Sequence, residues 1–130
     1  MAEETATETE IPPERAAGLI EAGEAELIDV RRPYEWEAGR IKGARLIELN
    51  ELTGEAESIS RERPVIFYCR SGNRSALAAA AFRQAGWDAY NLAGGLLAWV
   101  EHDLPLDPAD GEVAEPRPCL LYTSDAADEL

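Results

Sequence analysis

The chain has 130 residues, of which 45% are hydrophobic and 29% are charged, so one soluble domain with a single core is expected. Its 26 acidic and 12 basic residues give a net charge of −14, and such a surface repels the phosphates of nucleic acids. No apolar run approaches the roughly 18 residues of a membrane helix, and the acidic N-terminus differs from a secretory signal. These features predict a cytoplasmic protein that binds neither nucleic acid nor membrane.

Cysteine and histidine are scarce, which limits the chemistry available to the chain. The cysteines are Cys69 and Cys119, and the histidine is His102. This count excludes a disulfide scaffold, and a structural zinc site would also need a carboxylate ligand. We expect no metal and no cofactor. A mechanism that pairs serine or cysteine with histidine would have to use His102.

Strands and helices are predicted to alternate after an acidic N-terminal tail. Residues 1–10 lack apolar periodicity and are expected to be disordered. Pro13 suits the first turn of a helix that Gly23 ends. Apolar runs bounded by turn residues predict the strands, and alanine-rich or capped segments predict the other helices. The expected strands cover residues 25–30, 44–49, 65–68 and 89–92, and the expected helices cover 12–23, 33–38, 51–59, 75–85 and 95–102.

This alternation predicts an α/β fold over residues 11–105, with a mostly parallel central sheet flanked by helices on both faces. Residues 106–130 are polar, acidic and interrupted by proline, which predicts a second disordered tail. Within it, residues 119–130 resemble the translation of a sequencing adapter, so we expect that this stretch, with Cys119, is not native. The alternative is a genuine disordered tail, and neither interpretation assigns it a function.

The residues that carry chemistry lie between the clearest predicted strand and the clearest predicted helix. In an open α/β sheet, ligands bind at this kind of junction. Gly72 allows a tight turn that can aim backbone N–H groups inward, and the helix dipole adds positive potential. With two arginines beside it, the Cys69 sulfur is predicted to be a thiolate at neutral pH without a histidine base. The segment consists of Cys69, Arg70, Ser71, Gly72, Asn73, Arg74 and Ser75.

This segment resembles the active-site loop of the rhodanese family of single-domain sulfurtransferases. The similarity extends upstream to residues 27–31 (LIDVR) and 35–44 (EWEAGRIKGA), and downstream to residues 91–99 (NLAGGLLAW). Three motifs therefore occur in the family's order. One departure is Arg40, which stands where the family usually has a histidine, at a position that we interpret as structural.

The resemblance implies a reaction in two steps. Cys69 would take the outer sulfur of a donor such as thiosulfate as a persulfide, and would then pass it to cyanide, a thiol or a protein partner. The backbone amides of residues 70–75 would surround the persulfide, while Arg70 and Arg74 would attract an anionic donor. Asp29 and Arg31 would support the loop without acting as catalysts, and the alternative from the residues alone is a routine ion pair at a strand end.

Two other classes of function remain open from the sequence. The first is a rhodanese-fold sulfur carrier or interaction module without turnover, which the intact Cys69 and the two loop arginines disfavour. The second is a phosphatase-like or arsenate-reductase-like enzyme. Those relatives use a loop one residue longer, so the six-residue loop from Cys69 to Arg74 favours sulfur transfer.

Overall fold

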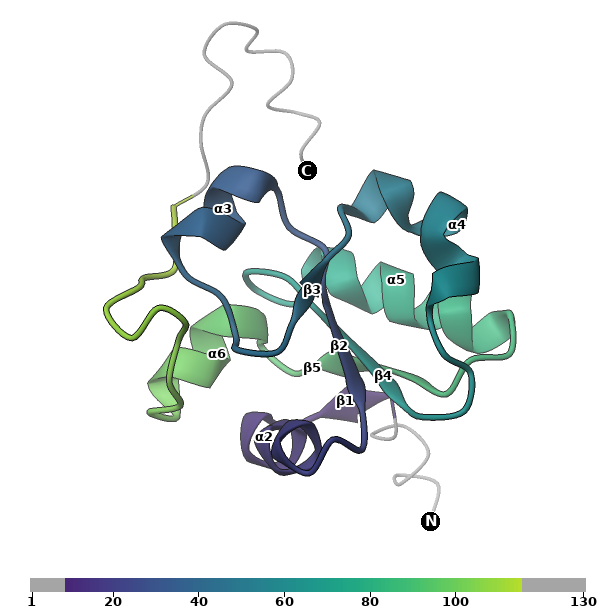
Figure 1. Ribbon diagram of the computed structural model, residues 1–130, viewed down its shortest axis with the longest axis horizontal. Coiled ribbons are helices and arrows are strands. Elements are labelled where there is room, and N and C mark those ends of the chain that lie inside the picture. Colours follow the sequence, from purple (N-terminus) through teal and green to yellow (C-terminus); the bar gives the residue numbers. More distant parts are fainter. Residues whose placement is uncertain (1–8, 116–130) are drawn as a thin grey trace, which may run out of the picture.

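The computed structural model describes residues 9–115 as a five-stranded sheet with helices packed around it (Figure 1). Neighbouring strands are parallel, and their order across the sheet is β1-β5-β4-β2-β3. Strand β4 is therefore central, with β5 and β1 on one side of it and β2 and β3 on the other. The strands are β1 (Glu10–Ile11), β2 (Glu26–Asp29), β3 (Arg45–Leu46), β4 (Val65–Tyr68) and β5 (Ala89–Leu92).

Helices connect the strands and cover both faces of the sheet, which confirms the predicted fold class. They are α2 (Pro13–Glu21), α3 (Pro33–Ala38), α4 (Leu52–Glu55), α5 (Asn73–Gln84) and α6 (Gly95–Glu101). The helix expected over residues 51–59 is instead a series of short turns, in which 3-10 turns at Leu49–Glu51 and Ala56–Ser58 flank α4. None of the helices within residues 9–115 is long and apolar enough to cross a membrane.

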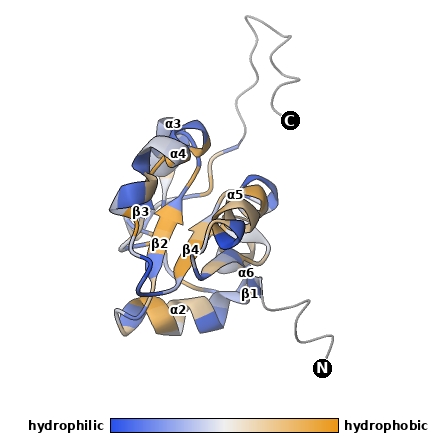
Figure 2. Cartoon of the chain, turned by 90° about the vertical axis from the view of Figure 1, so that its right-hand side faces the viewer, coloured by the Kyte–Doolittle hydropathy of each residue, from blue (hydrophilic) through white to orange (hydrophobic). Residues whose placement is uncertain are grey.

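Side chains alternate along the central strand, and this alternation divides the core into two layers. Val65 and Phe67 belong to the layer under α5, whereas Ile66 and Tyr68 belong to the layer under α2 and α6. All four are 0% exposed, and burying one such apolar side chain stabilises the fold by roughly 1.5–3 kcal/mol. Figure 2 shows the hydrophobic colouring concentrated along β2 and β4. The helices contribute Ala78, Ala79 and Phe82 to the first layer, and Ala16, Leu96 and Trp99 to the second.

The structure differs from the sequence prediction at both edge strands of the sheet. Glu10, expected in the N-terminal tail, begins β1, which pairs with β5 at the edge of the sheet. The strand expected over residues 44–49 is shorter, because only Arg45–Leu46 pairs with β2.

The prediction of a disordered tail from residue 106 is wrong for residues 106–115. Asp107 forms an antiparallel bridge with Arg40, and Leu106 and Val113 pack against the core. Burial of these two apolar side chains holds the segment against the core. The overall composition of the segment is polar, so the prediction from composition missed this contact. The predictions for residues 1–8 and 116–130, including the adapter-like stretch 119–130, lie outside the described residues.

Candidate active site

Cys69 directly follows the carboxyl end of β4, and helix α5 begins four residues later. Gly72 precedes the helix with a φ of 101°, a left-handed conformation that glycine adopts without steric cost. In this turn the Gly72 N–H donates to the Cys69 sulfur at 3.1 Å, and the Ser75 hydroxyl lies 3.3 Å from the same sulfur. Of the backbone N–H groups expected to turn inward, that of Gly72 contacts the sulfur, and the Ser75 hydroxyl is a side-chain contact that the sequence analysis did not anticipate.

The sulfur is buried, and its polar partners lie within apolar surroundings. Cys69 is 1% exposed and belongs to the core layer under α5. The first N–H groups of a helix have no partner inside that helix, and the helix dipole places partial positive charge there. A negative sulfur at this position would thus be stabilised by backbone dipoles rather than by water.

The amino end of α6 holds the loop from the other side. Leu96 N–H donates to the Cys69 carbonyl at 2.9 Å, and Leu97 N–H donates to the Arg70 carbonyl at 3.0 Å. Gly95 makes this approach possible, because a Cβ there would lie 2.5 Å from the Arg70 carbonyl oxygen. The sequence analysis placed Gly94 and Gly95 only within the 91–99 motif at the start of a helix, and missed that this turn fixes the loop.

Each loop arginine is held by a flanking acidic segment. Arg70 donates from Nε to the Ala114 carbonyl at 3.1 Å and lies 3.5 Å from the Glu115 carboxylate. Arg74 lies 3.6 Å from the carboxylate of Glu35, which is almost fully buried at the start of α3. The two arginine side chains retain 25% and 38% exposure, so both can still meet an anion from solvent.

The other predicted loop residues contribute differently. The side chains of Ser71 and Asn73 are exposed, so these residues can act on a ligand near Cys69 only through their backbone groups. Ser75 is buried and supplies its hydroxyl.

Asp29 and Arg31 form a fully buried ion pair and not an exposed one. Arg31 donates from Nε to Asp29 at 2.9 Å and from Nη2 at 2.8 Å, and Nη2 also donates to the Gly39 carbonyl at 2.8 Å. Burial alone would lower the pKa of Arg31, but the Asp29 carboxylate outweighs it and raises that pKa. The Arg31 side chain of this pair contacts the Gly39 carbonyl and the ring of Tyr68.

Two residues that the sequence analysis did not select also belong to this region. Asn91, at 3% exposure on β5, accepts from the Ser75 hydroxyl at 2.6 Å and donates to the Gly72 carbonyl at 3.2 Å. Glu35 pairs with Arg74 and accepts from the Arg32 N–H at 3.0 Å. A polar residue inside a short apolar strand was the available signal for Asn91.

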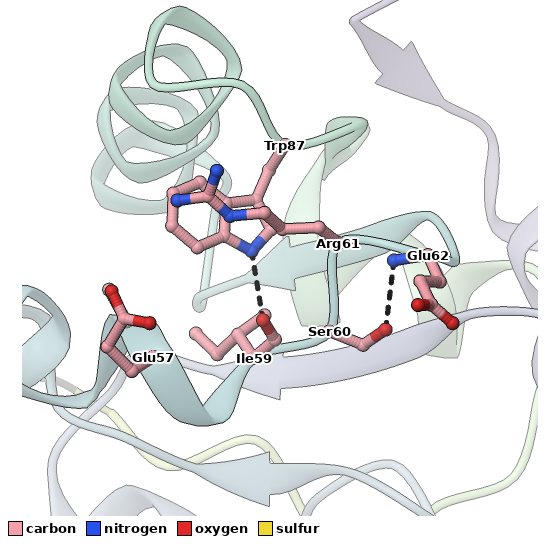
Figure 3. A pocket seen from close by; sticks show the side chains of 7 residues that line it. Glu57, Ile59, Ser60, Arg61, Glu62 and Trp87 are labelled. Atoms are coloured by element: carbon pink, nitrogen blue, oxygen red, sulfur yellow. Dashed lines mark hydrogen bonds between the residues drawn. The ribbon is translucent and has the colours of Figure 1, made fainter.

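A cavity of about 440 Å³ lies elsewhere, beside Trp87 (Figure 3). The guanidinium of Arg61 stacks 3.8 Å from the centre of the Trp87 ring, and the indole N–H donates to the Ile59 carbonyl. This cavity adjoins the segment that leads into β4, whereas Cys69 follows the opposite end of that strand. It therefore takes no part in the Cys69 site.

Among residues 9–115, no group of three His, Cys, Asp or Glu side chains is placed to hold a metal ion.

Comparison with known families identifies the class of protein that this fold and loop define. The family model for the rhodanese-like domain matches residues 12–102, so the chain belongs to that family. The solved structure of a rhodanese-related protein from Thermoplasma volcanium is similar, with a TM-score of 0.70 and 28% identity. That match covers 75% of this chain and 95% of the Thermoplasma volcanium chain.

Curated relatives are similar over most of the domain. A protein named sulfurtransferase from Allochromatium vinosum is 35% identical over 94 residues, which is 72% of this chain and 88% of that protein. The thiosulfate sulfurtransferase GlpE of Pseudomonas aeruginosa is 36% identical over 103 residues, covering 78% and 92%. YqhL of Bacillus subtilis, uncharacterised by name, is 45% identical over 76 residues, and this chain spans only 60% of its length.

Proposed function

We propose that this protein is a sulfurtransferase that carries a sulfane sulfur as a persulfide on Cys69. The observation that supports this most is the setting of the Cys69 sulfur, which accepts from the Gly72 N–H at 3.1 Å and lies 3.3 Å from the Ser75 hydroxyl oxygen. These donors can stabilise a negative sulfur during the reaction. Family membership and relatives named as sulfurtransferases agree with this chemistry.

In the first step, the Cys69 thiolate attacks the outer sulfur of thiosulfate. A new S–S bond forms to Cys69, the S–S bond of thiosulfate breaks, and sulfite leaves with the bonding electron pair. In the second step, cyanide or a thiolate attacks the terminal sulfur of the persulfide. Thiocyanate or a new persulfide departs, and the electron pair of the broken S–S bond returns to Cys69 as thiolate. No external oxidant or reductant is consumed.

The loop supplies the stabilisation that each step needs. Arg70 and Arg74 attract the anionic donor, and charge-assisted hydrogen bonds from guanidinium groups hold its oxygens. The amides of residues 70–75 surround the terminal sulfur, and Ser71, Gly72 and Asn73 contribute through the backbone. Asp29 and Arg31 are buried together, with the Arg31 guanidinium over the ring of Tyr68. In this proposal they support the end of β4 and do not contact the donor.

Access to the sulfur requires movement, since Cys69 is 1% exposed. Arg70 is one group that would move in this proposal, because its guanidinium is bonded to Ala114 and Glu115 and would have to release Glu115 to meet a donor. An exposed carboxylate contact of this kind contributes at most about 1 kcal/mol, so an anionic donor can replace it.

Steady-state formation of thiocyanate from thiosulfate and cyanide tests the proposal. The wild type should turn over with ping-pong kinetics, and Cys69→Ser should show none. Arsenate reduction or release of phosphate from an aryl phosphate, without thiocyanate, would assign the loop to oxyanion chemistry. Stoichiometric persulfide formation without turnover would identify a sulfur carrier instead of an enzyme.

A further inference from the structure

Asn91 lies where β5 borders the Cys69 loop. It pairs with Phe67 on β4, two residues before Cys69, so its side chain shares the sheet face that α5 covers. At this position a strand residue would ordinarily be apolar, as its cross-strand neighbour Phe67 is. A buried amide must satisfy its hydrogen-bonding groups, and Asn91 does so with three different parts of the chain.

The partners of Asn91 fix which way its amide points. Its Nδ2 donates to the Gly72 carbonyl at 3.2 Å and to the two Glu10 carboxylate oxygens at 3.2 and 3.1 Å. A carbonyl and a carboxylate can only accept, so the nitrogen must face them. The Asn91 oxygen is therefore turned toward Ser75, whose hydroxyl lies 2.6 Å away.

This acceptor determines where the Ser75 hydroxyl sits. Ser75 is in the first turn of α5, and a serine near a helix end can donate its hydroxyl hydrogen to a neighbouring backbone carbonyl. The Asn91 oxygen offers a competing acceptor on the other side of the side chain. With Ser75 held by it, the hydroxyl oxygen lies 3.3 Å from the Cys69 sulfur.

The hydroxyl has a single hydrogen and two acceptors within reach. That hydrogen can point to the Asn91 oxygen while Cys69 is neutral, and can rotate to the sulfur when the sulfur is negative. Rotation about the C–O bond breaks no covalent bond, and a charged acceptor makes the stronger hydrogen bond.

We infer that Asn91 is a positioning residue for Cys69, that it acts through Ser75, and that Glu10 fixes its amide. The consequence for sulfur transfer rests on the proposed function. The geometric claim, that removing Asn91 withdraws the Ser75 hydroxyl from the sulfur, does not.

A double-mutant cycle tests this inference. The rate constant of persulfide formation from thiosulfate is measured by rapid quench and mass spectrometry for wild type, Asn91→Ala, Ser75→Ala and the double variant. Each single change should slow the step by about tenfold, and the double variant should also be slowed by about tenfold rather than a hundredfold. The concentration of thiosulfate giving half-maximal rate should change less than about twofold, since Arg70 and Arg74 are unaltered.

Alkylation of Cys69 by iodoacetate, followed on its own peptide, provides a readout that does not depend on sulfur transfer. The alkylation rate should follow the same pattern as persulfide formation. Asn91→Ala should slow alkylation when Ser75 is present and should have no further effect in the Ser75→Ala variant. If the wild type forms no persulfide, the proposed function fails, while the alkylation cycle still decides the role of Asn91. Multiplicative effects of Asn91→Ala and Ser75→Ala, or an Asn91→Ala variant as reactive as wild type, would overturn the inference.

Glu10 provides a variant that does not disturb the core, because its side chain is exposed at the edge of the sheet. Glu10→Ala should slow Cys69 alkylation by about threefold, since the Asn91 amide loses the carboxylate that orients it. Glu10→Gln retains an acceptor oxygen and should restore the wild-type rate. If Asn91→Ala does not fold, this pair carries the test, and equal rates for Glu10→Ala, Glu10→Gln and wild type would refute the inference.

Discussion

At the residue scale, the Cys69 sulfur combines low exposure with donors directed at it. A buried thiol in apolar surroundings is ordinarily inert, because its charged form would be poorly solvated. Here the Gly72 N–H and the Ser75 hydroxyl replace part of the lost hydration. These groups are already in place before a donor arrives, so little reorganisation is needed when charge develops on the sulfur.

Arg74 is expected to act on the donor more than on the fold. Arg74→Ala should raise the KM for thiosulfate roughly fivefold, because a guanidinium beside the loop is lost. It should also lower the free energy of unfolding by about 1 kcal/mol, since Glu35 loses a partly exposed partner at 3.6 Å. Arg63→Ala is the matched control, because Arg63 pairs with Glu26 at the opposite end of the sheet. An unchanged KM in steady-state assays of Arg74→Ala would contradict this role.

Tyr68 should make the fold sensitive to alkaline pH. Burial, helped by the Asp29 charge, raises the pKa of Tyr68 well above its ordinary value of about 10. The unfolded chain therefore loses this proton first, and stability falls as pH rises above about 10 toward the folded-state pKa. Below about pH 10, Tyr68 is protonated in both the folded and the unfolded chain, and its contribution to stability is fully present.

Tyr68→Phe should remove this part of the alkaline decline, measured by urea unfolding near pH 7 and above pH 10. At neutral pH the variant should be about 1 kcal/mol less stable, because the Ile41 N–H loses its acceptor. Tyr34→Phe, which changes a residue outside the core, should keep the wild-type slope. Equal slopes for Tyr68→Phe and wild type would show that Tyr68 ionisation does not govern alkaline stability.

At the scale of elements, the site depends on the close approach of α6 to the loop after β4. Gly95 has a φ of 65° and leaves room for the Cys69 and Arg70 carbonyls, which accept from the first amides of α6. The two elements thus contact through their backbones. A side chain at Gly95 would separate them.

Gly95→Ala should lower the free energy of unfolding by roughly 2–3 kcal/mol and should slow persulfide formation, because the loop must shift. Gly18→Ala is the control in another helix: it has open space around the new Cβ and should be stabilising by about 0.5–1 kcal/mol. Chemical unfolding of both variants measures the difference. A Gly95→Ala protein as stable as wild type would contradict the claim that the close approach of α6 to the loop requires glycine at this position.

Elements with strong local signals could be predicted from the sequence. The apolar run of β4 and the alanines of α5, which Gly86 follows, place Cys69 at a strand–helix junction without any tertiary information. Strand β1 could not be predicted, because two residues carry no periodicity and pair with β5 only after the chain has folded. Residues 106–115 were missed for the same reason, since their order comes from contacts with Ala38 and Arg40.

At the scale of the whole molecule, the candidate site joins segments that are distant in sequence. Glu10 and Asn91 are 81 residues apart, and Arg70 and Ala114 are 44 apart. Sequence motifs identified the loop but not these contacts, because nothing in the local pattern specifies which polar groups meet. The burial of Asp29 with Arg31 was equally hidden, since adjacent charges at a strand end are usually exposed.

The central claim is that Cys69 accepts a sulfur atom, and the mass of the intact chain tests it most directly. After incubation with thiosulfate and removal of excess donor, the wild type should gain the mass of one sulfur atom, and cyanide should remove it. Cys69→Ser should gain nothing, while Cys119→Ser should behave as wild type. A wild-type mass that does not change, or a gain that persists in Cys69→Ser, would contradict the account.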